Sequence, residues 1–273
     1  MTAGFQYFLV GQKYAVRALV SIASLREFYP AQRIAICVGD DVAYGYAVRI
    51  ASEFDCSIVR WESPTGRKAR HHCAKVCLPE LSPFSSTIFL DADTLVDGHL
   101  EELWPDKGQV VLTQFSDWVT TGDKISSRLS KYDDAVPDRV KAVTSKSYPA
   151  INTGVFSYSL SATIWLRRWK EIVESKPPVF MGDEIVANIL VDWDCVRVLD
   201  DRFNASPKFY SLAANDSVRI WHYHGNKHFR EGYAGDRWKS RFDSVWDDNA
   251  ANVREWAPAG DKELAIYLES VKC

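Results

Sequence analysis

Segments typical of strands and of helices alternate through the first hundred of the 273 residues, and this pattern constrains the fold most strongly. Segments with helical spacing of apolar residues separate short apolar runs of strand length. The predicted strands are 5–10, 33–38, 56–61 and 87–90, and the predicted helices are 12–28, 43–54 and 67–81. Such alternation predicts an α/β fold with a mostly parallel central sheet flanked by helices on both faces. Ligands of such sheets bind at the carboxyl ends of the strands.

The second half of the chain interrupts this pattern and then resumes it. Segment 116–149 is mostly polar and contains Gly122, Pro137 and Pro149, so we expect at most short helices there. A long polar segment of this kind is typically a lid or a binding loop. Regular structure is predicted again for strands at 109–115, 151–157, 196–199 and 218–223, and for helices at 161–174 and 183–191.

Composition disfavours several classes of protein. The formal net charge of −3 gives no reason to expect nucleic-acid binding. No run of 18 apolar residues indicates a membrane span, and the first residues lack the pattern of a secretory signal. The six cysteines have the spacing of neither a zinc site nor a disulfide framework. We therefore expect reduced thiols and a cytoplasmic location.

Asp91-Ala92-Asp93 directly follows the predicted strand 87–90. Side chains at positions i and i+2 of extended backbone point to the same side, so both carboxylates can face one cation. Oxygen ligands of this kind suit a hard divalent metal. Two acids at this spacing also occur often by chance, and the pair alone predicts no more than a metal site or an acidic turn.

Five further blocks accompany the acidic pair. They are Tyr14-Ala15-Val16-Arg17-Ala18-Leu19-Val20, Lys75 at sixteen residues before Asp91, Asn152-Thr153-Gly154-Val155-Phe156, Gly182-Asp183-Glu184, and Trp221-His222-Tyr223-His224-Gly225-Asn226-Lys227-His228. Together with 90–96, they resemble the retaining glycosyltransferases of family 8, which include glycogenin and bacterial lipopolysaccharide galactosyltransferases. The resemblance implies a GT-A fold for residues 1–228, with 229–273 as a C-terminal basic-aromatic extension.

The resemblance implies a binding site for a UDP-sugar in the first part of the chain. Tyr14 would stack on the uracil, as its exposed ring face allows, although it could equally anchor the helix. Lys75 would contact the diphosphate region as a point cation, unless it is a solvated helix residue. Asp91, Ala92 and Asp93 would bind the donor and the metal.

The same resemblance implies that Asn152 and Gly154 line the side of the site that takes the donor sugar and the acceptor. Glycine there would let the backbone approach a ligand closely. Asp183 would contact hydroxyls of the donor sugar and is a candidate nucleophile, while a helix N-cap is its structural alternative. Glu184 stands where the family has glutamine, so its role stays open, and we treat Asn152, Asp183 and Glu184 as candidate catalytic residues.

The last block would complete the metal site. His222 matches the family's metal-ligating histidine, and Gly225 matches the glycine three residues later. The family's lysine falls at His228, whereas Lys227 comes one residue early, so either could hold the diphosphate. Two carboxylates and an imidazole favour Mn²⁺, with Mg²⁺ as an alternative.

The resemblance therefore implies metal-dependent, retaining transfer of glucose or galactose from a UDP-sugar to a hydroxyl of a glycan, glycolipid or protein. Two alternatives stay open: an inverting GT-A glycosyltransferase, and a catalytically silent protein that binds a sugar nucleotide or a glycan. The aromatic and basic residues of 229–246 could contact the inner face of a membrane peripherally or form a packed subdomain. The sequence does not indicate an oligomeric state.

Overall fold

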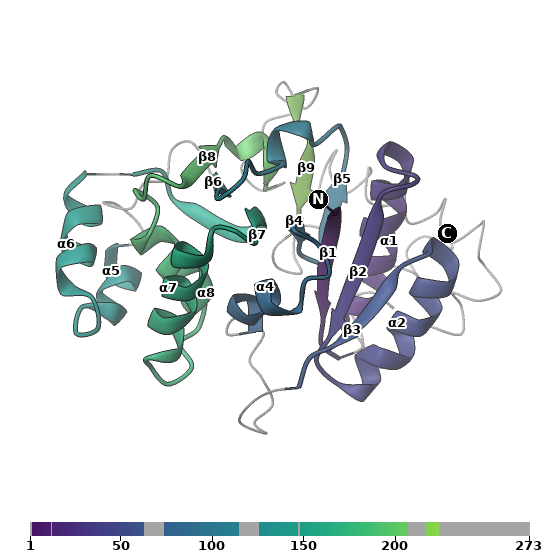
Figure 1. Ribbon diagram of the computed structural model, residues 1–273, viewed down its shortest axis with the longest axis horizontal. Helices are drawn as coiled ribbons and strands as arrows, with labels where there is room; N and C mark the ends of the chain where they lie inside the picture. Colours follow the sequence, from purple (N-terminus) through teal and green to yellow (C-terminus); the bar gives the residue numbers. More distant parts are fainter. Residues whose placement is uncertain are drawn as a thin grey trace, which may run out of the picture.

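The computed structural model describes residues 2–11, 13–62, 74–114, 126–146, 148–206 and 217–223. A seven-stranded sheet with the order β3-β2-β1-β4-β7-β6-β8 forms its centre (Figure 1). The strands are β1 (Ala3–Leu9), β2 (Arg33–Val38), β3 (Ser57–Arg60), β4 (Ser86–Leu90), β6 (Val110–Gln114), β7 (Ile151–Ser159) and β8 (Val196–Leu199).

Helices and 3₁₀ turns connect these strands. The helices are α1 (Lys13–Phe28), α2 (Asp41–Phe54), α4 (Leu78–Leu81), α5 (Ser126–Leu129), α6 (Pro137–Lys146), α7 (Thr163–Glu174) and α8 (Gly182–Ile189). The 3₁₀ turns are η1 (Lys75–Cys77), η2 (Glu101–Leu103), η3 (Ser130–Tyr132) and η4 (Asp201–Phe203). The predicted α/β architecture with helices on both faces is confirmed.

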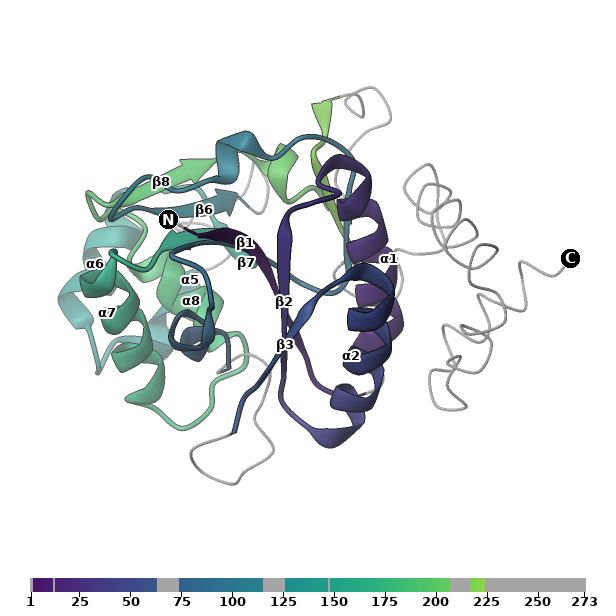
Figure 2. The same ribbon diagram turned by 45° about the vertical axis from the view of Figure 1, so that its right-hand side comes forward.

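Alternating residues of the strands pack against different helices, because successive side chains of a strand point to opposite faces. On one face, Phe8, Phe89 and Phe156 join a core that includes the buried residues of α7 and α8. On the other face, Tyr7 and Ile88 pack with the buried residues of α1 and α2. Figure 2 shows α1 and α2 on the side of the sheet opposite α7 and α8.

One central strand runs against the others, which the sequence did not predict. β7 is antiparallel to both of its neighbours, β4 and β6, whereas the remaining pairs in the sheet are parallel. Its amino end therefore lies beside the carboxyl end of β4, where Leu90 pairs with Val155. The Asp91 N–H then donates to the carbonyl of Gly154 at 2.7 Å. This reversal joins two predicted site segments at one edge of the sheet.

A second, two-stranded sheet brings the distant histidine to the acidic pair. β5 (Thr94–Val96) pairs antiparallel with β9 (Ile220–His222), and Thr94 lies opposite His222. The Tyr223 N–H donates to the carbonyl of Asp93 at 2.9 Å and extends the pairing. The sequence predicted β9 as part of a longer strand, but it did not predict β5.

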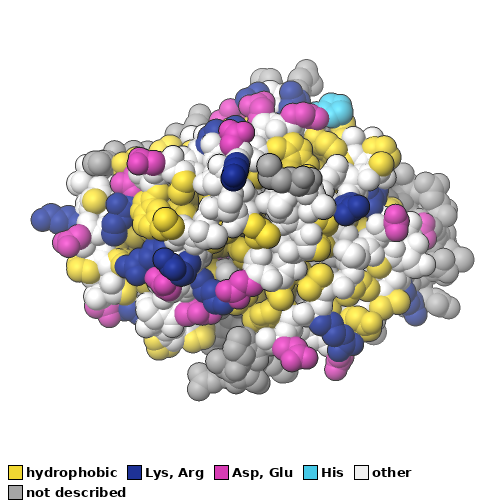
Figure 3. All heavy atoms as spheres, viewed as in Figure 1, with side chains coloured by type: hydrophobic (Ala, Val, Ile, Leu, Met, Phe, Trp, Pro, Cys, Tyr) yellow, Lys and Arg dark blue, Asp and Glu magenta, His cyan; other side chains and the backbone are white. Residues whose placement is uncertain are grey.

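The described part of segment 116–149 contains α5, η3 and α6, and the ten residues of α6 make it longer than the short helices that we expected. Val140 and Val143 are buried and join the core beside α8. Within predicted helix 67–81, residues 74–81 are helical, and 63–73 lie outside the described residues. In the described part of the chain, no helix is long and apolar enough to cross a membrane. Figure 3 shows acidic and basic side chains interspersed on one face.

Candidate functional site

A pocket of about 410 Å³ lies where β4 ends and β7 begins. Its walls include every predicted site residue that the structure describes. These are Tyr14, Lys75, Asp91, Ala92, Asp93, Asn152, Gly154, Asp183, Glu184 and His222. Phe8, Thr153, Phe180 and Met181 complete the lining, and the sequence did not single them out as site residues. The structure thus brings the predicted residues together, while the role of each one stays a prediction.

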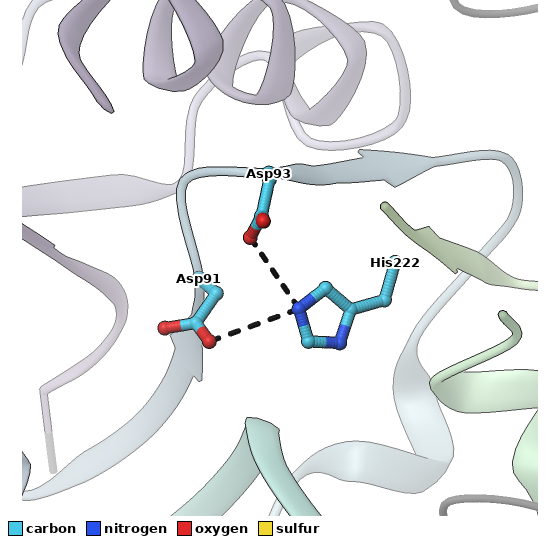
Figure 4. Close-up of side chains that lie close together, drawn as sticks. All are labelled: Asp91, Asp93 and His222. Carbon is cyan, nitrogen blue, oxygen red and sulfur yellow. Dashed lines mark ion pairs between the residues drawn. The ribbon is translucent and has the colours of Figure 1, made fainter. Parts of the chain in front are cut away.

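Asp91, Asp93 and His222 form one candidate metal centre. One ligand atom from each residue lies within 4.8 Å of the other two. The Nε2 atom of His222 is 3.4 Å from Asp93 Oδ1 and 3.8 Å from Asp91 Oδ2, so both carboxylates face the same ring nitrogen (Figure 4). His222 and Asp93 are buried. Two carboxylates and one imidazole fit a divalent transition metal such as Mn²⁺.

The other ring nitrogen of His222 points away from this centre. Nδ1 lies 2.7 Å from Oδ1 of Asn204, a buried residue that directly follows η4. Gly154 lies against the same ring: a Cβ built on it would be 2.1 Å from His222 Cε1. From the sequence, we explained Gly154 by the close approach of a ligand to the backbone. The structure shows a different reason within the protein, because any larger side chain at this position would collide with the ring of His222.

Lys75 lies between two acids of the pocket. Its Nζ atom is 2.8 Å from Asp91 Oδ2 and 3.9 Å from Asp183 Oδ2, and it donates to the carbonyl of Thr153 at 3.1 Å. Burial lowers the pKa of Lys75, but the two nearby carboxylates outweigh burial and raise it. The ammonium therefore stays charged. Burial in turn raises the pKa of Asp91, against the opposing effects of Lys75 and His222.

Asp183 lies in the first turn of α8 and not at its N-cap, which is Met181, so the N-cap alternative for Asp183 is wrong. The reason is the left-handed backbone of Met181 (φ 58°), which starts the helix two residues earlier. Asp183 Oδ2 accepts a hydrogen bond from Thr153 Oγ1 at 2.9 Å. Oδ1 is buried, and among the described residues no donor reaches it. A buried carboxylate oxygen of this kind indicates a missing donor, such as a ligand hydroxyl.

Glu184 is buried beside Asp183 and keeps its proton more readily than an ordinary glutamate. Burial raises its pKa from 4.5 to about 8, the charge of Asp183 adds to this, and Arg128 opposes it. Oε2 accepts from Asn152 Nδ2 at 2.7 Å, and Oε1 lies 3.5 Å from Nη1 of Arg128 on α5. At neutral pH the group is therefore largely uncharged, as a glutamine would be.

Arg17 is a further charged residue of the site that the sequence did not single out. Its Nη1 lies 3.8 Å from Asp93 Oδ2, and its guanidinium is 5.8 Å from the ring centroid of Tyr14. Tyr14 itself lies in the first turn of α1 and lines the pocket. The spacing of three residues places both side chains on one face of α1, and this spacing could have indicated Arg17. Asn204 had no comparable signal.

Gly225, Lys227 and His228 lie outside the described residues, as does extension 229–273. Nothing in the structure therefore chooses between Lys227 and His228 as the diphosphate cation.

Several solved structures share this fold. The galactosyltransferase LgtC in complex with donor and acceptor sugar analogs matches with a TM-score of 0.61 and 16% sequence identity, over 88% of this chain and 95% of that one. The glycosyltransferase GlyE of Streptococcus pneumoniae TIGR4, in its apo form, matches with a TM-score of 0.60 and 14% identity, over 93% of this chain and 64% of that one. The chain has the GT-A fold. This confirms the fold that the resemblance implied.

At this level of identity, the likeness demonstrates the GT-A fold and leaves activity to be argued from the site. The bifunctional glycosyltransferase WbbM is a third similar structure, with a TM-score of 0.53 and 13% identity over 88% of this chain and 51% of that one. None of the protein-family models matches the sequence. No curated protein matches it in sequence either.

Proposed function

We propose that the protein is a glycosyltransferase that moves a hexose, glucose or galactose, from a UDP-sugar to a hydroxyl acceptor. The observation that carries this proposal is one pocket of the GT-A fold, where β4 ends and β7 begins. It holds a carboxylate–imidazole group at one end and a buried carboxylate oxygen without a donor at Asp183. LgtC, which shares the fold, binds donor and acceptor sugar analogs.

Asp91, Asp93 and His222 would hold a divalent cation, with Mn²⁺ favoured by the mixed donor set. When bound, such a cation would stabilise the negative charge of the departing diphosphate. Arg17 and Lys75 partly offset the charge of the two aspartates and keep them in place for this purpose.

The rest of the donor would lie along the pocket. Tyr14 would stack on the uracil, because its ring lines the pocket in the first turn of α1. Lys75 would add fixed positive charge near the diphosphate, and Gly225 with Lys227 or His228 would hold its far side. Fixed charges of this kind favour the transition state because they need no reorganisation.

The donor sugar would lie beside Asp183, Glu184 and Asn152. Asp183 Oδ1 would accept a hydrogen bond from a sugar hydroxyl, which would satisfy the oxygen that has no donor among the described residues. Glu184, largely neutral, would act as the family's glutamine does and position the sugar through Asn152. We propose that the anomeric configuration is retained, with Asp183 as the candidate nucleophile.

Segment 116–149 would contribute to the acceptor side and exclude water from the reaction. The contact between Arg128 of α5 and Glu184 supports this, because it ties the segment to the wall of the pocket. We propose residues 1–228 as the catalytic domain, with 229–273 as an extension packed on or beside it. The acceptor would be a glycan, a glycolipid or a protein.

A screen of sugar nucleotides with MnCl₂ tests the proposal. We expect one UDP-hexose to raise the melting temperature and to be hydrolysed slowly, and we expect Asp93→Asn and His222→Ala to abolish the dependence on Mn²⁺. NMR of the transfer product then gives its anomeric configuration. A product with inverted configuration would show that the protein is an inverting glycosyltransferase and not a retaining one. Binding without any turnover would indicate a silent sugar-nucleotide-binding protein. If no sugar nucleotide binds, the proposed function is wrong.

A further inference from the structure

Backbone groups determine which way the side-chain amide of Asn204 points. Its Nδ2 atom lies 3.1 Å from the carbonyl oxygen of Asn152, which can only accept a hydrogen bond. It also lies 2.9 Å from Oγ1 of Thr113, whose own proton goes to the carbonyl of Val155 at 2.6 Å. The amide nitrogen therefore faces these acceptors, and Oδ1 must face His222.

This orientation in turn determines where the proton of His222 is. Nδ1 lies 2.7 Å from Asn204 Oδ1, and an amide oxygen can only accept. Nδ1 must therefore carry the hydrogen, which leaves the lone pair of Nε2 directed at the carboxylates of Asp91 and Asp93. In a metal site, the hydrogen bond made by the second ring nitrogen sets which nitrogen is the ligand.

Neighbouring residues hold Asn204 and His222 in this arrangement. Asn152 Oδ1 accepts from the Gly154 N–H at 2.8 Å and from Asn204 Nδ2 at 3.2 Å, so the Asn152 amide is oriented as well. The backbone next to Asn204 pairs with β9: the His222 N–H donates to the carbonyl of Ala205 at 2.8 Å. Asn204 and His222 are both about 2% exposed, so bulk water has little access to the hydrogen bond between them.

We propose that Asn204 is a positioning residue that holds His222 in the Nδ1–H tautomer and thereby presents Nε2 as a metal ligand. The benefit to metal binding rests on the proposed function, whereas the tautomer is a property of the protein alone. Loss of an outer partner of a ligating histidine typically lowers metal affinity about 10- to 100-fold. No donor or acceptor substrate needs to contact Asn204 for this effect.

Long-range ¹H–¹⁵N NMR of the metal-free protein in alkaline buffer tests the tautomer directly, with His222→Gln used to assign the signals. We expect a protonated Nδ1 and an unprotonated Nε2 in the unchanged protein. Asn204→Ala should produce a mixture of tautomers and raise the Kd for MnCl₂ about 10- to 100-fold, without any sugar nucleotide. Asn204→Asp keeps an acceptor facing Nδ1 and should keep the tautomer.

Asn188→Ala is the matched control, because Asn188 is an equally buried asparagine with three hydrogen bonds to backbone groups of Ile151 and Glu184. It should leave the His222 tautomer unchanged. A protonated Nε2 in the unchanged protein would overturn the proposal even if Asn204→Ala did not fold. An unchanged tautomer in Asn204→Ala would overturn it too. A protein with the expected tautomer that binds neither Mn²⁺ nor a sugar nucleotide would refute only the proposed function.

Discussion

Replacing Gly154 by alanine should dislodge His222 from the metal centre. A Cβ at this position would lie 2.1 Å from Cε1 and 2.6 Å from Nδ1 of His222, and 2.9 Å from Oδ1 of Asn152. Ordinary van der Waals contact begins at 3.4 Å, so the imidazole ring would have to retreat by more than an ångström. The ring cannot do this freely, because it is about 2% exposed and is bound to Asn204.

The size of the effect follows from this geometry. Overpacking in a closely packed interior costs about 1–3 kcal/mol, so we expect a loss of stability in this range. Displacement of the ring by more than an ångström removes one of three protein ligands. Disturbing only an outer partner of a ligand already costs about 10- to 100-fold in affinity, so the Kd for Mn²⁺ should rise by at least roughly 100-fold.

Calorimetric titration with MnCl₂ and urea denaturation of the Gly154→Ala protein provide the two measurements. Gly45→Ala is the matched control, since Gly45 lies in the exposed face of α2 and a Cβ there would meet nothing within 4 Å. It should stabilise the protein by about 0.5–1 kcal/mol and leave Mn²⁺ binding unchanged. If Gly154→Ala bound Mn²⁺ as tightly as the unchanged protein, our account of the histidine's position would be refuted.

Three further substitutions test the charges and the aromatic wall of the pocket. Lys75→Met leaves the buried Asp183 carboxylate and the partly exposed Asp91 carboxylate without their cation, and it should destabilise the protein by about 3–5 kcal/mol in urea denaturation. A loss of under about 1 kcal/mol would contradict the buried pair of Lys75 and Asp183. Glu184 keeps in the folded state a proton that the unfolded chain releases near pH 4.5, so its contribution to stability is complete below that pH and is lost as pH rises to about 8. Glu184→Gln should remove this decline, which amounts to at most about 1.4 kcal/mol per pH unit. The measurement is the free energy of unfolding of both proteins from about pH 5 to 9. The same pH dependence in both proteins would exclude the raised pKa of Glu184. Tyr14→Ala should weaken UDP binding by about 1–3 kcal/mol in a calorimetric titration, whereas Tyr14→Phe, which keeps the ring, should not. Equal affinities of the two variants for UDP would argue against stacking.

Most secondary structure could be predicted because its signals are local. β2 and β8 have the predicted bounds, since each is a short apolar run ended by turn residues. The direction of β7 could not be predicted, because a buried apolar run reads the same in a parallel and in an antiparallel strand. β5 has three residues and was overlooked, because a strand that short has no measurable period.

Among the residues of the candidate site, too, those with a local sequence signal could be predicted and those without one could not. Asp91 and Asp93 could be recognised from their spacing of two residues directly after a strand. The extended backbone assumed for this stretch is a turn in the structure, in which the Thr94 N–H donates to the carbonyl of Asp91 at 3.2 Å. His222 was found only through resemblance to a family, because its position depends on the pairing of β5 with β9. In this pairing Leu95 lies opposite Trp221, which is 126 residues later in the chain. Asn204 had no local signal and becomes visible only through its hydrogen bonds.

The amino-acid pattern alone was therefore enough for the α/β class, for the order of most elements and for the acidic pair, because each depends on residues close together in the chain. Tertiary structure decided which side chains face each other. It reversed β7 so that Gly154 meets Asp91, and it paired β9 with β5 so that His222 meets Asp93. The physical reason is that buried polar groups must find partners wherever the folded backbone places them, and here those partners are distant in sequence.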